Sequence, residues 1–150
     1  MSTKERLTDD MKQAMKDKEA GKLRLSVIRM VRASIKNVEI DRKRELAEDE
    51  VLDVLAKELK LRRDAMVEFE KANRLDLVEN LEKEVAVLMD YLPQQLTEEE
   101  VRAFVTDAVQ QTQASNAKDM GKVMAALMPK VKGRADGKLV NTIVREMLNN

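Results

Sequence analysis

The side chains best suited to binding chemistry are basic residues gathered near the end of the chain. From position 118 to 145 there are seven Lys or Arg against two acids, a local charge of +5, whereas the whole chain carries 28 residues of each sign. In this region a helical stretch that we expect to end at Pro129 is followed by a basic connector and a second amphipathic helix. Concentrated positive charge of this kind indicates an anionic partner such as nucleic acid. The connector contains Lys130, Lys132, Gly133, Arg134, Gly137 and Lys138.

The glycines of the connector resemble those of a nucleotide phosphate loop, but their spacing excludes one. A Walker A loop has four residues between its glycines and a Ser or Thr after its lysine. Here three residues separate Gly133 from Gly137, and a leucine follows the lysine. We predict instead that Gly133 provides a left-handed or tight backbone turn and that Asp136 caps the following helix.

Two interpretations of the connector remain open at this point. In the first, Lys130, Lys132 and Arg134 are solubilising surface residues that also complement the negative end of the preceding helix. In the second, the same side chains bind RNA phosphates. Gly133 then lets the backbone approach the phosphates, and the first N–H groups of the next helix add donors.

Most catalytic and metal-binding chemistry is excluded by the composition. The chain has no Cys and no His, which removes disulfides, ordinary zinc sites and the Cys–His and Ser–His nucleophile pairs. Its many carboxylates include no pair that the sequence marks as an acid–base site. We therefore expect a protein with no chemistry of its own, no metal and no cofactor.

The hydropathy of the chain bears on its location. The opening MSTKERLTDDMKQ has no apolar run of the kind found in a secretory signal. No stretch reaches the roughly 18 apolar residues that a membrane span requires. We expect a cytoplasmic protein that has no membrane partner.

The composition predicts an all-α fold. Charged residues make up 37% and aromatic residues 2% of 150 residues, with four Gly and two Pro, which favours long helices around an aliphatic core. We expect Met15 and Met30 to help fill that core, together with Phe69 and Phe104. Capping signals and 3.6-residue periodicity predict helices from Ser2 to about Lys18, from about Lys22 to Asp41, over Val51–Phe69, over Leu77–Met89 with an end near Leu92, over Val101–Thr112, over Met120–Met128 and over Leu139–Met147.

A domain boundary is predicted at the junction YLPQQL, residues 91–96. Pro93 disfavours helix at the residue before it, and Thr97 with Glu100 forms a capping-box signal for a new helix. We therefore predict an N-terminal domain of four helices, residues 1–93, and a C-terminal domain of three helices, residues 94–150.

Charge is unevenly distributed along the N-terminal part. Residues 22–44 hold eight bases and two acids, a charge of +6, and residues 45–100 hold seven bases and seventeen acids, a charge of −10. We expect the basic helix to lie against the acidic helical pair, with charges partly paired at its edges and otherwise solvated. The alternative is a second nucleic-acid contact through Arg29, Arg32 and Lys36.

Four segments carry a resemblance that covers the full chain. They are the opening LTDDMKQAMKDKE, the basic helix LSVIRMVRASIKNVEID, the junction YLPQQLTEEE and a tail with Gly121-Lys122 and Lys132-Gly133-Arg134-Ala135-Asp136. By these motifs the chain resembles the YqeY-like family of the GatB/YqeY superfamily. Its C-terminal part resembles the tail domain of the B subunit of the tRNA-dependent amidotransferase, which implies a three-helix tail.

The resemblance also implies a role. In the amidotransferase the tail meets the body of the tRNA while chemistry happens elsewhere, so the resemblance favours the RNA interpretation of the connector. We therefore expect an accessory RNA-binding module whose partners are tRNA and an amidotransferase or aminoacyl-tRNA synthetase. The positions that match the expected contact surface are Lys122, Lys130, Lys132, Gly133, Arg134 and Lys138.

Two further expectations qualify this role. The label of carbon–nitrogen ligase with glutamine as amide donor, which accompanies the resemblance, describes the parent complex, because the catalytic core of that enzyme is far larger than this chain. An alternative function is a protein–protein adaptor in which the acidic residues 45–100 and the tail dock onto a tRNA-handling enzyme. The aromatic content limits how RNA could be contacted. With one Tyr, two Phe and no Trp, any RNA contact is expected to be dominated by phosphates and sensitive to salt.

Overall fold

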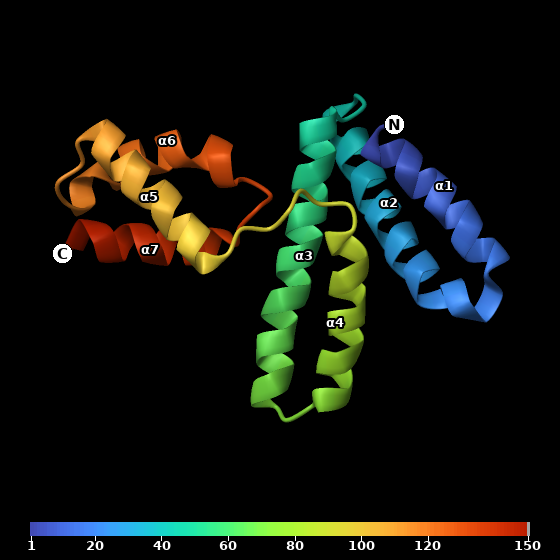
Figure 1. Cartoon of the computed structure of the whole chain (residues 1–150). Helices are drawn as coiled ribbons and strands as arrows, with labels where there is room; N and C mark the ends of the chain where they lie inside the picture. Colours follow the sequence, from blue (N-terminus) through green and yellow to red (C-terminus); the bar gives the residue numbers. More distant parts are fainter. Residues whose placement is uncertain (150) are drawn as a thin grey trace. The chain divides into compact units, whose positions relative to one another are not determined.

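The computed structural model describes residues 1–149 and places them in seven α-helices and two short 3₁₀ turns, without a strand. This confirms the predicted all-α class. The chain divides into two compact units, Met1–Leu92 and Pro93–Asn150, each with its own hydrophobic core (Figure 1).

The N-terminal unit consists of two helical hairpins. Its helices are α1 (Thr3–Lys16), α2 (Lys22–Arg42), α3 (Glu48–Lys71) and α4 (Leu75–Met89). α1 packs against α2 and α3 packs along α4, as the blue and green helices of Figure 1 show. The first and fourth helices are shorter than predicted, because a 3₁₀ turn at Lys18–Gly21 and a turn after Met89 end them.

The tight connection between α1 and α2 at Gly21 has a steric cause. Gly21 is buried, and a Cβ at this position would lie 2.3 Å from the carbonyl oxygen of Ala14. Any side chain would therefore collide with the backbone of α1, so the α1–α2 hairpin can close only around a glycine.

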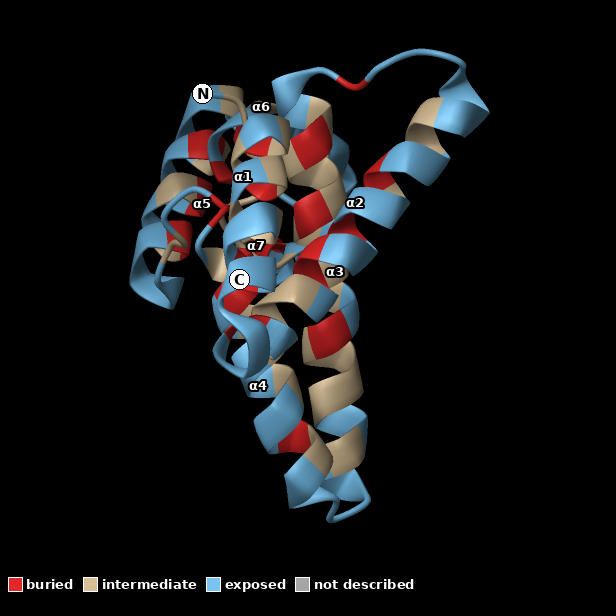
Figure 2. Cartoon of the chain, turned by 90° about the vertical axis from the view of Figure 1, so that its right-hand side faces the viewer, coloured by how far each residue is buried: buried red, intermediate tan, exposed pale blue. Residues whose placement is uncertain are grey.

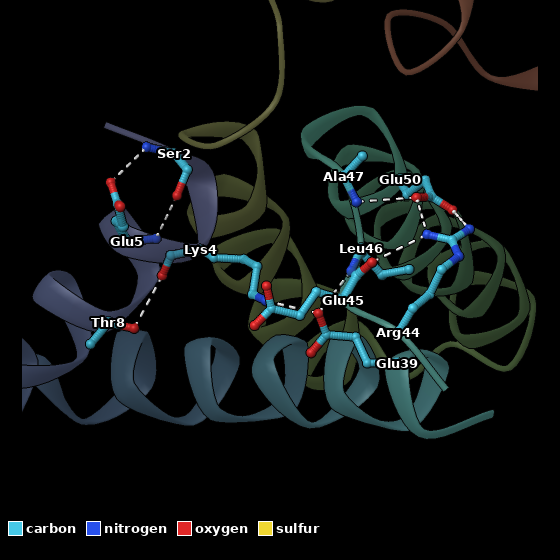
Figure 3. A network of polar contacts seen from close by, with 10 residues as sticks. All are labelled: Ser2, Lys4, Glu5, Thr8, Glu39, Arg44, Glu45, Leu46, Ala47 and Glu50. Atoms are coloured by element: carbon cyan, nitrogen blue, oxygen red, sulfur yellow. Dashed lines mark hydrogen bonds and ion pairs between the residues drawn. The ribbon is translucent and has the colours of Figure 1, made fainter. Parts of the chain in front are cut away.

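Polar contacts hold the start of α1 against the turn between α2 and α3 (Figure 3). The Ser2 hydroxyl accepts from the Glu5 amide at 3.2 Å and the Glu5 carboxylate accepts from the Ser2 amide at 3.0 Å, and this reciprocal pair forms a capping box. The Glu39 carboxylate accepts from Lys4 Nζ at 2.8 Å and from the Leu46 amide at 2.9 Å. The hydrogen bond from Lys4 is the main cause that lowers the pKa of Glu39.

A second carboxylate, that of Glu50, organises the first turn of α3. Arg44 donates to its two oxygens at 2.8 and 2.7 Å, the Ala47 amide donates at 3.1 Å, and Arg42 also pairs with it. The Arg44 hydrogen bonds, followed by the Ala47 amide, lower the pKa of Glu50 to about 2. Arg42 and Arg44 of the basic segment 22–44 are thus paired with Glu50 of the acidic segment that follows, at the turn between α2 and α3.

The core of the N-terminal unit is aliphatic apart from one tyrosine. Figure 2 shows the buried residues as bands on α2 and α3, while the far end of the α3–α4 hairpin is mostly exposed. Met15 and Met30, which we expected in the core, are 52% and 50% exposed, and Phe69 is only partly buried. The core residues are Leu7, Val27, Ile28, Val31, Ile35, Leu46, Val51, Leu55, Leu59, Val87, Leu88, Tyr91 and Leu92.

A buried cation joins three helices of this unit. Arg62 on α3 is 5% exposed, and its guanidinium pairs with Glu58 at 2.8 Å and with Glu84 of α4 at 3.3 Å. The hydroxyl of Ser34 on α2 donates to the second oxygen of Glu58 at 2.8 Å, and Arg62 Nη2 lies 3.7 Å from the sulfur of Met30. A buried charge requires such partners, because an unpaired one is very costly.

Tyr91 connects the end of α4 to the first hairpin. Its ring is 4% exposed, its hydroxyl donates to Asp10, and Arg24 donates to the same hydroxyl at 3.2 Å. The guanidinium of Arg6 lies over the ring, 4.9 Å from its centroid. Burial, and next the hydrogen bond to Asp10, raise the pKa of Tyr91 to about 12.

The C-terminal unit packs α5 (Glu98–Thr112) against α6 (Met120–Val131) and α7 (Gly137–Asn149). The Thr97 hydroxyl accepts from the Glu100 amide at 3.2 Å and caps α5 as predicted. Phe104 packs against the core as expected. The buried residues of this core are Val101, Val105, Ala108, Val123, Leu127, Val131, Val140, Ile143, Val144 and Leu148.

The predicted end of the sixth helix at Pro129 is wrong, because α6 continues to Val131. A proline lacks the amide hydrogen but has a helical φ, so near the end of a helix it removes a single backbone bond. Val131 is 1% exposed in the core, and the Lys132 amide donates to the Met128 carbonyl at 2.9 Å. The core contact of Val131 therefore extends the helix past its proline.

We predict that Arg62→Ala lowers the free energy of unfolding by about 3 kcal/mol, because it leaves two partly buried carboxylates, Glu58 and Glu84, without their cation. Urea unfolding followed by circular dichroism measures this change. The matched control is Lys60→Ala, which removes an exposed pair with Asp64 on the same helix and should cost less than about 1 kcal/mol. Equal losses in the two variants would contradict the role of Arg62.

We predict that Tyr91 ionises with a midpoint near pH 12 in the folded chain and near its ordinary value of 10 after unfolding in urea. The raised pKa favours the neutral phenol in the fold. This contribution to stability is therefore complete below pH 10 and is lost as the pH rises toward 12. Tyrosinate absorbance measures the titration, since the chain has one Tyr and no Trp. Asp10→Asn should lower the midpoint, and a native midpoint near 10 would refute the explanation.

Candidate functional site

The residues expected to contact RNA lie on α6, on the connector after it and on the first turn of α7. Lys130, Lys132 and Lys138 are exposed, and Arg134 is partly buried. Lys130 is in the last turn of α6, Lys132 is the first residue after α6, and Lys138 is the second residue of α7. The structure therefore gathers Lys130, Lys132, Gly133, Arg134 and Lys138 at one end of α6, and we call these five residues the connector cluster.

Lys122 lies away from the connector cluster. It is eight residues before Lys130 on α6, a separation of about 12 Å along the helix axis. Its Nζ donates to the carbonyl oxygen of Thr112, the last residue of α5, at 3.3 Å. Its charge also lowers the pKa of the nearby Asp119 carboxyl, after the larger effect of the Ser115 amide. Lys122 thus has a structural role at the α5–α6 junction.

The backbone of the connector follows the predicted geometry. Gly133 has a φ of +74°, which confirms the predicted left-handed turn. Nothing lies within 4 Å of a Cβ built there, so the requirement for glycine is conformational rather than steric. Asp136 accepts from the Lys138 amide at 3.0 Å, which confirms the predicted cap of α7.

The same cap corrects one expected feature of the site. We expected the first N–H groups of the last helix to be donors for phosphate. The Asp136 carboxylate occupies the Lys138 amide and places a negative charge at that helix end. Phosphate contacts in this region would therefore depend on side chains.

Hydrogen bonds clamp the start of the C-terminal unit onto the connector. The Leu96 amide donates to the Arg134 carbonyl at 2.8 Å, and the Gln95 side-chain amide donates to the Gly133 carbonyl at 2.8 Å. Arg134 Nε donates in return to the Gln94 carbonyl at 3.3 Å. The Gln95 amide also reaches the Pro93 carbonyl at 3.0 Å. Sequence reasoning missed this clamp, because its two sides are almost forty residues apart and neither carries a pairing signal.

The clamp changes the interpretation of Arg134. Its guanidinium holds residues 94–96 in place in addition to any contact with a ligand. Arg134 is therefore a poor residue for testing ligand binding, since its replacement would also disturb the fold.

The geometry of the described residues bears on metals and membranes as well. Within residues 1–149, no group of three or more His, Cys, Asp or Glu side chains is arranged to hold a metal ion. No helix in that part of the chain is both long enough and apolar enough to cross a membrane.

These features define a helical protein of two units, in which the second unit is a three-helix tail with a basic connector. The chain belongs to the YqeY-like protein family, whose pattern it matches over residues 4–148. This confirms the resemblance drawn from the motifs.

Three named proteins are similar to this chain in sequence. "Altered inheritance of mitochondria protein 41, mitochondrial" of Lachancea thermotolerans is 37% identical over 113 residues, which cover 73% of this chain and 59% of that protein. The protein of the same name in Pyrenophora tritici-repentis is 30% identical over 146 residues, covering 95% and 79%. A subunit of the glutamyl-tRNA(Gln) amidotransferase of Thermococcus gammatolerans is 44% identical over 57 residues, covering 35% and 9%. The chain thus spans about three fifths of the Lachancea protein and a small part of the amidotransferase protein.

The comparisons contradict the predicted cytoplasmic location. Several relatives, including those from Lachancea and Pyrenophora, are named as mitochondrial proteins. The prediction rested on the lack of an apolar N-terminal run, which excludes a secretory signal and has no bearing on other compartments.

We predict that Gln95→Ala weakens the clamp by about 1 kcal/mol, the usual value of one hydrogen bond. Amide hydrogen exchange at Leu96 should then become about five times faster. Gln94→Ala is the matched control, because it removes an exposed side chain and leaves the carbonyl that accepts from Arg134. Unchanged protection of Leu96 in the Gln95 variant would show that the clamp does not depend on this side chain.

Proposed function

We propose that this chain is an accessory RNA-binding protein for tRNA, that the connector cluster contacts the phosphates, and that the chain carries no chemistry of its own. The observation that carries the proposal is the exposure of Lys130, Lys132 and Lys138 around a left-handed turn, in a chain with no net charge.

The position of Lys138 favours a ligand over a purely structural role for these charges. Lys130 and Lys132 lie at the C-terminal end of α6, where a cation complements the helix dipole. Lys138 lies in the first turn of α7, at the positive end of that dipole, where a cation is unfavourable. The helix dipole therefore accounts for the positions of Lys130 and Lys132 but not for that of Lys138.

The family relationship supports tRNA as the class of RNA. The amidotransferase protein that shares 44% identity over 57 residues is named for glutamyl-tRNA(Gln). A segment shared with a protein that handles tRNA is a reasonable place for a tRNA contact. The match covers 35% of this chain and 9% of the amidotransferase protein, so the shared segment supports binding rather than amide transfer.

The aromatic residues support a contact made through phosphates. Tyr91 is buried and Phe104 packs against the C-terminal core. The described part of the C-terminal unit, residues 93–149, therefore has no exposed aromatic ring on which a base could stack. Binding through cations alone is expected to depend on RNA shape and on salt.

The alternative is an adaptor that docks onto a tRNA-handling enzyme, and a separate feature favours it. The acidic α3–α4 hairpin exposes three apolar side chains, Leu61, Val67 and Leu75, to between 50% and 63%. Such residues suit a protein partner better than a polyanion. An adaptor would bind its enzyme without RNA, and its affinity would depend on these residues.

We predict that the native chain binds folded tRNA and that Lys130→Gln, Lys132→Gln and Lys138→Gln together weaken this binding. Gel-shift titrations at several salt concentrations measure it. The slope of log K against log salt should flatten by about two to three units, at about 0.7–0.9 per lost phosphate contact. Arg134 stays in place because it holds the clamp.

The matched control replaces Lys60, Lys71 and Lys83 by Gln, which changes the net charge equally on the α3–α4 hairpin, where these lysines pair with carboxylates. The control should bind tRNA like the native chain. Failure of the native chain to bind any tRNA would refute the proposal and leave the adaptor function.

A further inference from the structure

The outer side of α2 carries a stripe of cations. At 100° per residue, Lys22, Arg29, Arg32 and Lys36 fall within a sector of about 80°, and all four are exposed. The acids of α2, Glu39 and Asp41, lie outside this sector. We call these four residues the α2 stripe, and they extend over about 21 Å along the helix axis.

Two charges of the α2 stripe have no carboxylate partner in the part of the chain that the structure describes. Within residues 1–149, no carboxylate lies within ion-pair distance of Lys22 or Arg29, whereas the neighbouring Arg24 pairs with Asp10 and Asp90. Like charges three and four residues apart on a helix repel one another. A stripe of this kind is therefore a surface that an external anion would stabilise.

A groove borders the α2 stripe on the side of α1. Its volume is about 480 Å³, and Arg32 and Lys36 belong both to its lining and to the stripe. The buried Leu7 and Ile35 line it as well. Arg32 Nη1 lies 2.8 Å from the sulfur of Met11, which is a weak acceptor and does not neutralise the guanidinium. The groove therefore gives the stripe a concave margin lined by two of its cations, and, after the larger effect of the hydrogen bond from α1, the charge of Lys36 also helps to lower the pKa of the Glu39 carboxylate.

The carboxylates of the groove limit how an anion can lie in it. Glu39 and Glu45 line the groove, and Glu39 is already paired with Lys4 at 2.8 Å. A polyanion would avoid the uncompensated Glu45. It would therefore follow the stripe from Lys36 toward Arg29 rather than fill the groove to that carboxylate.

We propose that the α2 stripe is a second phosphate-contacting surface, which takes the sugar–phosphate backbone of a folded RNA. The length of the stripe matches several successive phosphates rather than one small anion. The surface belongs to the N-terminal unit, so it does not depend on the connector cluster. Two such surfaces on one chain allow bivalent binding, in which the second contact benefits from a high effective concentration.

An anionic membrane fits this surface less well. A helix that binds a membrane surface buries an apolar face at the boundary of the acyl chains. The apolar face of α2, including Val27, Val31 and Ile35, is already buried in the core. On the side of the stripe, Ile40 is the large apolar residue that is well exposed, at 61%. The α2 stripe therefore presents charge but no apolar face that could insert into a membrane.

The test compares the full-length native chain with a stripe variant, Arg29→Gln, Arg32→Gln and Lys36→Gln, in gel-shift titrations of folded tRNA at several salt concentrations. The slope of log K against log salt should flatten by about two to three units, and the affinity at low salt should fall at least tenfold. Circular dichroism of both chains verifies that helix content is retained. The control is the hairpin variant at Lys60, Lys71 and Lys83, which has the same net charge and should bind like the native chain.

Three results would overturn the proposal. They are an unchanged slope in the stripe variant, an equal loss in the hairpin variant, and loss of binding to vesicles of anionic phospholipid without any change in tRNA binding. The connector variant, with Gln at 130, 132 and 138, separates the two surfaces. If the connector variant binds tRNA normally and the stripe variant does not, the connector proposal fails and the α2 stripe stands.

Discussion

The arrangement of the N-terminal unit depends on the burial of one guanidinium group. Arg62 needs Glu58 and Glu84 to compensate its charge, and Ser34 then has to face Glu58. A shift of α2 along the hairpin would leave an oxygen of the partly buried Glu58 carboxylate without its donor, so these bonds define the register of three helices. Because the inner side of α2 is occupied by this network and by the aliphatic core, its remaining cations lie on the outside. The outer surface of α2 is thus basic because its inner side is already occupied by the Arg62 network and the aliphatic core.

Features that depend on neighbouring residues could be predicted from the sequence. The Ser2–Glu5 capping box, the left-handed Gly133 and the Asp136 cap all involve residues at most three positions apart. Hydrophobic periodicity likewise predicted the helices, with errors of a few residues at their ends. Pro129 was misread as a helix end because the opposing contribution, the burial of Val131, comes from the packing of the unit rather than from the local sequence.

Features that depend on distant residues could not be predicted in the same way. The bond between Gln95 and Gly133 joins two loops, and nothing in either loop specifies the other. Periodicity placed Met30 on a helix face, yet whether a face is covered depends on where other helices lie, and Met30 remains half exposed. Arg62 differs from these examples, because its neighbours in the sequence do indicate that it is buried. It occupies a position on the apolar side of α3, three residues after Leu59 and four after Glu58, and a cation there requires a buried partner.

The placement of the aromatic residues has a consequence for spectroscopy. Tyr91 is the single tyrosine, the chain has no tryptophan, and Tyr91 belongs to the unit Met1–Leu92. Tyrosine fluorescence therefore reports on the N-terminal unit alone, whereas far-ultraviolet ellipticity reports on the helices of both. Denaturation curves from the two signals coincide if the units unfold as one cooperative system and separate if they do not. The chain thus contains an intrinsic probe that distinguishes the melting of one unit from that of the other without any added label.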